Sequence, residues 1–151
     1  MSAMKMKDEG GGSIIEFAII SPLLFVAVFG VIELGVLLYD KAVLTNASRE
    51  GARAGTVYDT ALRDDNGGVN YSAVEDAVYD AVDDYIDFLI SVSGPVSLGP
   101  PEVVPENGGK SLRVTLTYPF RFLVFSNVLA LLGGSVGNLV TLKAETVMRF
   151  E

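Results

Sequence analysis

The chain has 151 residues, which allows one compact domain and an anchoring segment but not two full domains. Its formal net charge of −8 makes it a poor partner for nucleic acid, whose phosphates attract basic surfaces. It contains no cysteine and no histidine, which excludes a disulfide framework, zinc sites of the usual type and nucleophiles activated by histidine. We expect no cofactor, no metal and no small-molecule substrate.

The first forty residues predict a short leader followed by a membrane-spanning helix. The leader, Met1–Gly12, is polar and ends in three glycines, and Phe17–Ile32 contains no charged residue. With Glu16 and Glu33 included, the apolar stretch covers Ile14–Tyr39, which corresponds to about 39 Å of helix. That length is enough to cross a bilayer core of about 30 Å.

Three local features bear on the orientation and shape of this segment. Lys5 and Lys7 precede it, so the positive-inside rule places the N-terminus in the cytoplasm and the rest of the chain outside. Pro22 removes a backbone hydrogen bond and should kink or loosen the helix. An ordinary signal peptide is disfavoured, because the apolar region exceeds the usual length of about 7–15 residues and no Ala-x-Ala cleavage site follows closely.

Two helical patterns follow in the chain. Beyond Tyr39 small and polar residues continue the first helix to a stop near Gly55, so a helix of about 40 residues should leave the membrane as the spine of an outer domain. A second, amphipathic helix is predicted over Tyr71–Ile90. Its apolar stripe comprises Val74, Val78, Ala81, Val82, Tyr85, Ile86 and Leu89, and its acidic side comprises Glu75, Asp76, Asp80, Asp83, Asp84 and Asp87.

The acidic segments predict a turn and a solvated surface rather than a metal or catalytic site. The Asp-Asp-Asn-Gly sequence at residues 64–67 fails as a calcium loop, because Leu62 and Ala73 stand where an EF-hand needs acids. A hydrolase using paired carboxylates such as Asp83 and Asp87 is disfavoured, because no apolar pocket pattern surrounds them to raise a pKa. We therefore expect no enzyme.

The last third of the chain changes to the alternation of strands. Short strands are expected at Val96–Leu98 and, between flanking prolines, as an edge segment at best at Glu102–Val104. Longer strands are expected at Lys110–Tyr118 and Asn138–Phe150, joined by a buried or membrane-grazing apolar crossover at Phe120–Leu132. The inward residues are Leu112, Val114, Leu116, Tyr118, Val140, Leu142, Ala144, Met148 and Phe150, and the outward residues are Ser111, Arg113, Thr115 and Thr117. The fold class is therefore α+β, with a short antiparallel sheet.

Glu16 is the most informative residue of the sequence. A carboxylate costs about 2.5–3.5 kcal/mol at the centre of a membrane helix and less near the interface. Its neighbours on both sides are apolar, so another group must offset that cost. Water at headgroup level is one such group, and a positive charge from another chain is the other.

Stretches at both ends of the chain form a recognisable pattern. They are Gly-Gly-Ser-Ile-Ile-Glu-Phe-Ala at 11–18, Pro-Leu-Leu at 22–24, Gly-Val-Ile-Glu-Leu-Gly at 30–35 and Leu-Thr-Asn-Ala-Ser-Arg-Glu-Gly-Ala-Arg-Ala at 44–54. Together they resemble the TadE-like family, minor pseudopilins of the tight-adherence (Tad) pilus, with Ser48 where that family usually has alanine. Residues 140–149 are similar to the family's closing strand, whereas the middle, Thr56–Pro105, is not diagnostic. The resemblance implies a pilin-like domain.

The resemblance also implies roles for residues of the first helix. A prepilin peptidase would cut between Gly11 and Gly12, although the glycine run allows a shift of one, and leave Glu16 as the fifth residue of the mature chain. The Glu16 carboxylate would then pair with the amino terminus of an adjacent subunit and set the register, while the helix from Phe17 onward anchors and packs. Glu33 is either a headgroup-level acid or a second contact between subunits.

A third implied site lies farther along the same helix. Arg49, Glu50 and Arg53 occupy neighbouring helical positions, where they either contact another subunit or form a solvated face, and Glu50 and Arg53 can pair at i,i+3. The implied organisation is a leader over 1–11, an assembly helix over 12–39 and an outer domain over 40–151. Expected partners are other pilins or pseudopilins, the Tad assembly platform, the peptidase and the bacterial cytoplasmic membrane. The alternative is a single-pass, membrane-tethered binding or sensor module.

Overall fold

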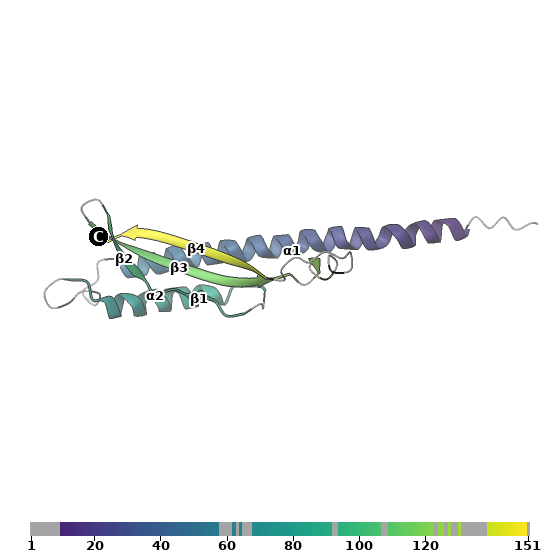
Figure 1. Cartoon of the computed structure of the whole chain (residues 1–151). Coiled ribbons are helices and arrows are strands. Elements are labelled where there is room, and N and C mark those ends of the chain that lie inside the picture. The colour runs from purple at the N-terminus through teal and green to yellow at the C-terminus, as the bar shows by residue number, and fades with distance from the viewer. Residues whose placement is uncertain are drawn as a thin grey trace, which may run out of the picture.

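The computed structural model describes residues 10–57, 62, 64, 68–91, 94–106, 109–122, 124, 125, 127, 130 and 139–150. Its first element, α1, runs from Gly10 to Thr56 without a break at Pro22. Figure 1 shows α1 as a rod whose N-terminal half extends beyond the rest of the molecule. The predicted long spine helix is confirmed, and it ends one residue after the expected stop at Gly55.

The second helix, α2, covers Tyr71–Ile86 and packs along the C-terminal half of α1. Asn70 caps it, because its side chain accepts a hydrogen bond from the backbone N–H of Ala73 at 3.3 Å. The central part of the predicted stripe, Val74, Val78 and Val82, is buried. The prediction that α2 reaches Ile90 is wrong.

A four-stranded antiparallel sheet completes the α+β fold. Its strands are β1 (Ser97–Leu98), β2 (Glu102–Glu106), β3 (Gly109–Arg121) and β4 (Leu139–Arg149). β4 pairs with β3 along one edge, and β1 and β2 share the other edge. The sheet lies beside the C-terminal half of α1 (Figure 1), with α1 in contact with both long strands.

The core lies where the two helices meet the inner face of the sheet. Its largest buried side chains are Tyr118, Phe120, Leu44, Leu112 and Leu116. Two polar contacts tie β4 to the spine: Lys41 donates to the Lys143 carbonyl, and the hydroxyls of Ser48 and Thr146 lie 2.8 Å apart. The buried side chains of β3 and β4 confirm the expected inward faces of both long strands in their central parts.

The sheet departs from the sequence predictions in three places. Ser111, expected outward, is fully buried at the position where β3 pairs with Val104 of β2 and Arg149 of β4. Val140, expected inward, is 38% exposed at the start of β4. β2 continues through Pro105, which an edge strand tolerates because one side makes no ladder hydrogen bonds.

The apolar crossover predicted over 120–132 falls only partly within the described residues. Phe120 belongs to β3 and is buried, whereas residues 122, 124, 125, 127 and 130 are partly buried or exposed. The predicted acidic turn is also described in part: the backbone N–H of Asp64 donates to the Gly68 carbonyl at 2.9 Å, which closes a turn, and residues 65–67 lie outside the described residues.

Candidate assembly site on the long helix

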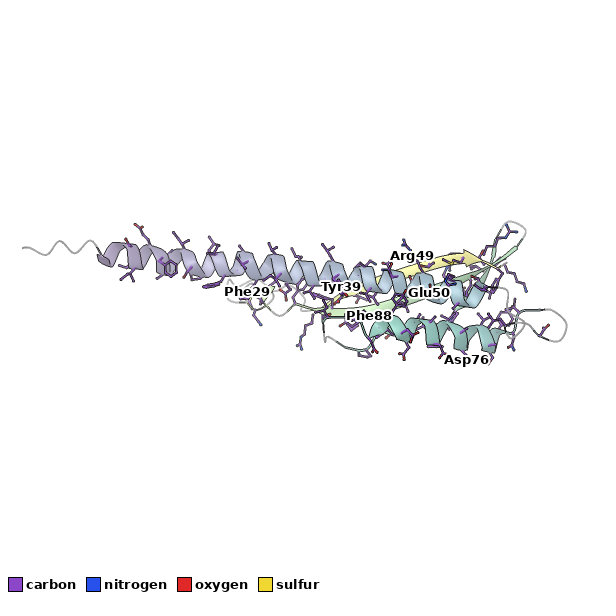
Figure 2. The ribbon with its side chains drawn as sticks, turned by 180° about the vertical axis from the view of Figure 1, so that it is seen from behind. Phe29, Tyr39, Arg49, Glu50, Asp76 and Phe88 are labelled. Atoms are coloured by element: carbon purple, nitrogen blue, oxygen red, sulfur yellow. The ribbon has the colours of Figure 1, made fainter. Side chains whose placement is uncertain are left out.

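The side chains of α1 divide at Glu33 into a bare half and a packed half. No residue from 11 to 32 is buried. From Glu33 onward burial recurs every three or four residues, which is the period of one helix face. The buried positions are Glu33, Asp40, Val43, Leu44, Ala47, Ser48, Gly51, Ala52, Gly55 and Thr56. Figure 2 shows the same division, with side chains projecting freely around the N-terminal half.

Glu33 joins α1 to the segment that follows β3. Its two carboxylate oxygens accept hydrogen bonds from the backbone N–H groups of Val124, at 3.2 Å, and Phe125, at 2.9 Å. The Glu33 side chain is only 9% exposed. Both N–H groups would otherwise lack an acceptor, so Glu33 fixes this segment at one height along the helix.

Asp40 makes a second connection two turns farther along α1. It is fully buried, and its carboxylate accepts the backbone N–H of Ile90 at 3.1 Å and the Ser91 hydroxyl. The Ser91 hydroxyl lies 2.9 Å from that of Tyr118, which also donates to the Ser91 carbonyl. This polar network links α1, the end of α2 and β3. It also explains why α2 stops early, since Asp40 captures an N–H that a longer helix would use.

Gly51 and Gly55 let the packed half approach its neighbours closely. A Cβ on Gly51 would lie 2.8 Å from Val82 Cγ2, and one on Gly55 would lie 2.5 Å from Leu112 Cδ2 and 2.8 Å from Val78 Cγ2. The sequence suggested only that these glycines weaken the helix. Their observed position makes them contact points between α1, α2 and β3.

Of the residues predicted to act in processing and register, Glu33 begins the packed half and the others lie in the bare half. Gly11 and Gly12 fall in the first turn of α1, where backbone N–H groups have no partner within the helix. Glu16 and Phe17 are exposed, and Glu16 forms no hydrogen bond or ion pair with any residue that the structure describes. Their proposed roles stay predictions.

Comparison with known proteins finds one family that α1 resembles. The model of the family described as TadE-like protein matches residues 11–53. The match lies wholly within α1. No curated protein and no solved structure matches the chain.

The TadE-like match ends where the basic residues of α1 lie. Arg53 donates to Glu50 through Nε at 3.0 and 3.1 Å and through a terminal nitrogen, which confirms the expected i,i+3 pair. The hydrogen bond from Arg53 lowers the pKa of the Glu50 carboxyl, and the same contact raises the pKa of Arg53. Arg49 is exposed (Figure 2), and whether these residues contact another subunit stays a prediction.

Outside the TadE-like helix the described residues offer little chemistry. No group of three acidic residues among them could hold a metal ion. Asp76 projects from α2 away from α1 (Figure 2), as a solvated acidic face requires. A pocket of about 280 Å³ lies beside the end of α2, lined by Ile86, Asp87, Leu89, Ser91, Gly94, Pro95, Val96 and Tyr118. Of its polar side chains, Ser91 already bonds to both Asp40 and Tyr118.

Sequence reasoning missed two features of this helix. The partners of Glu33 come from a segment some ninety residues later, and nothing in the local pattern identifies them. The burial of Asp40 was likewise not predicted. One signal was available: Asp40 lies seven residues after Glu33 and four before Leu44, on the face that becomes buried.

Proposed function

We propose that this chain is a minor pseudopilin-like structural subunit for assembly of a Tad-type pilus, processed once by a prepilin peptidase. One observation carries the proposal: the TadE-like match covers a helix whose residues 11–32 bear exposed apolar side chains. Ile14, Phe17 and Leu23 are each about 70% exposed, and such side chains need lipid or other helices around them. The role is structural, and the chain performs no reaction of its own.

Membrane insertion is the state that the helix supports before assembly. Within the described residues α1 is the one helix long and apolar enough to cross a membrane, and its most apolar 18-residue window has no buried residue. The proposed orientation places the N-terminus in the cytoplasm and the domain outside, because the lysines precede the helix.

The proposed processing site fits the local helix energetics. The bond between Gly11 and Gly12 lies in the first turn of α1, and each glycine costs about 1 kcal/mol relative to alanine within a helix. A turn built from three glycines opens easily, so a peptidase can reach an extended backbone there. Cleavage removes residues 1–11 and creates a new amino terminus four residues before Glu16.

The proposed role of Glu16 follows from its lack of a hydrogen-bond donor or cation among the described residues. A carboxylate in an apolar environment is stabilised when a positive charge neutralises it, and leaving it unpaired is costly. The amino terminus of a neighbouring subunit supplies that charge when helices stack in register. The partners of this contact are other pilins or pseudopilins, with the Tad assembly platform beside them.

Intact-mass measurement of the protein from its native membrane tests the proposal. The expected mass corresponds to the loss of residues 1–11, and Gly11→Val should abolish that loss while membrane insertion persists. Gly30→Val is the matched control, because a Cβ at Gly30 meets no atom within 4 Å in the same bare half. A native protein that keeps its first methionine, with the Gly11→Val variant indistinguishable from it, would point instead to a tethered binding module.

A further inference from the structure

We propose that the membrane-facing end of the outer domain docks on the outer leaflet of the bilayer, between the levels of Glu33 and Asp40 on α1, through an apolar rim. The apolar rim consists of Phe88, Ile90, Phe125 and Val140, which are 60%, 59%, 43% and 38% exposed. This inference rests on the proposed membrane anchorage and adds a second, lateral contact with lipid.

The first observation is the height of Glu33 along α1. Glu33 lies 17 residues after Glu16, which is about 26 Å at about 1.5 Å per residue and close to the bilayer core of about 30 Å. A boundary at Tyr39, as the sequence suggested, would bury Glu33 about 10 Å deeper together with the two backbone N–H groups that bond to it. A boundary at Glu33 instead places both carboxylates at the two interfaces.

The second observation is where the domain exposes apolar side chains. Phe125 is held at Glu33 by its own N–H, and Ile90 is held at Asp40 by its own N–H, so both lie at the end of the domain nearest the bare half. Val140 pairs with Phe120 in the last part of β3, at the same end. Figure 2 shows Phe88 beside the middle of α1, close to Tyr39.

The third observation is charge. Arg121 and Lys143 are separated by residues 122–142, which include no Asp, Glu, Lys or Arg. The exposed acids of α2 extend from Glu75 to Asp87, of which Asp87 adjoins Phe88 and the others lie farther from the anchor. Aromatic and aliphatic side chains without charge enter the headgroup and upper acyl region of a membrane, whereas an acidic surface is excluded from it. The polarity of the domain therefore matches an outer leaflet at its anchor end.

The chain contains no tryptophan, so single introduced tryptophans report depth in the bilayer without background. The full chain is reconstituted in phosphatidylcholine vesicles, with and without lipids brominated on the acyl chain. Phe125→Trp and Phe88→Trp probe the rim, Phe29→Trp probes the anchor, and Tyr79→Trp is the matched control. Tyr79 is 44% exposed, nearly the same as Phe125, but lies in the middle of α2.

We expect bromine quenching of the rim variants to exceed that of Tyr79→Trp by about threefold, with Phe29→Trp quenched most strongly. Rim variants quenched no more than Tyr79→Trp, with Phe29→Trp still quenched, would overturn the docking inference and leave the anchor intact. Rim tryptophans whose emission is blue-shifted but not quenched by bromine would also overturn the docking inference, because another protein copy then covers these residues. An unquenched Phe29→Trp would overturn the membrane anchorage itself and the docking with it.

Discussion

Residues 11–32 and residues 33–56 form one continuous helix, yet their side chains meet different surroundings. In the second half two acids, Glu33 and Asp40, are buried and bonded to backbone N–H groups of the same chain. In the first half Glu16 has no partner among the described residues. The comparison teaches that the role of a carboxylate on this helix depends on its half: the packed acids hold the domain in place, whereas the bare acid is the one for which we propose a contact with another molecule.

The largest expected effect follows from removing the Asp40 carboxylate. Asp40→Ala leaves the Ile90 N–H and the Ser91 hydroxyl buried without their acceptor, so the free energy of unfolding should fall by about 3 kcal/mol or more. Urea unfolding of the full chain in detergent, followed by circular dichroism, measures it. Glu16→Ala is the control from the bare half and should leave the midpoint unchanged. Equal urea midpoints for Asp40→Ala and Glu16→Ala would contradict the division of α1 into a packed half and a bare half.

Removing Glu33 should have a smaller and more local effect. Glu33→Ala deprives the Val124 and Phe125 N–H groups of their acceptor, at a cost of about 1–3 kcal/mol. Hydrogen exchange of these two amides should accelerate, whereas that of Val78, in the middle of α2, should change less. Glu33→Gln keeps one carbonyl oxygen as an acceptor. Its exchange rates at the two amides should therefore lie between those of Glu33→Ala and those of the native protein. Unchanged exchange at both amides would show that Glu33 does not hold the segment.

Replacement of a glycine by alanine should change the stability in opposite directions in the packed half and in the bare half of α1. Gly55→Ala places a Cβ 2.5 Å from Leu112 Cδ2, and overpacking of about 1–3 kcal/mol should exceed the gain of about 1 kcal/mol in helix propensity. A Cβ at Gly30, in the bare half, meets no atom within 4 Å, so Gly30→Ala should be neutral or slightly stabilising. Thermal unfolding of the two variants side by side checks this. A change of the same sign in the unfolding temperature of both variants would contradict the packing argument.

The smallest expected effect is the pH dependence of the exposed pair on α1. The hydrogen bond from Arg53 lowers the folded-state pKa of Glu50 below its ordinary value of 4.5. The contribution of the pair is therefore fully present above pH 4.5 and is lost as the pH falls through the lower, folded-state pKa. Arg53→Ala should reduce this acid dependence by an amount near the detection limit of urea midpoints, because the pair is exposed to solvent. A large difference at neutral pH would indicate a further contact of Arg53.

Local patterns predicted most of the elements and their faces. The long helix, the Val74, Val78 and Val82 stripe and the inner face of β3 all follow from periodicity, since each repeats on a single element. The errors share a different cause. α2 ends at Ile86 because a carboxylate on another helix takes the Ile90 N–H. Ser111 is buried where its strand lies between β2 and β4, although the alternation of β3 places it outward.

The candidate site shows the same limit. Gly11, Glu16 and the Arg49–Arg53 run were found because they lie in one stretch of sequence that the TadE-like match also covers. The intramolecular partners of Glu33 and the close contacts of Gly55 depend on residues far away in sequence. Periodicity on one helix cannot identify which distant backbone groups will meet it.

The contacts between α1 and β4 have a consequence for solubility. Among the described residues β4 pairs with β3 alone, and an eleven-residue strand with one free edge is a template for strand addition by another copy. Lys41 occupies the Lys143 carbonyl, the Ser48 hydroxyl contacts that of Thr146, and β4 itself carries the charged Glu145 and Arg149. The packed half of α1 thus hinders pairing of β4 with a second sheet.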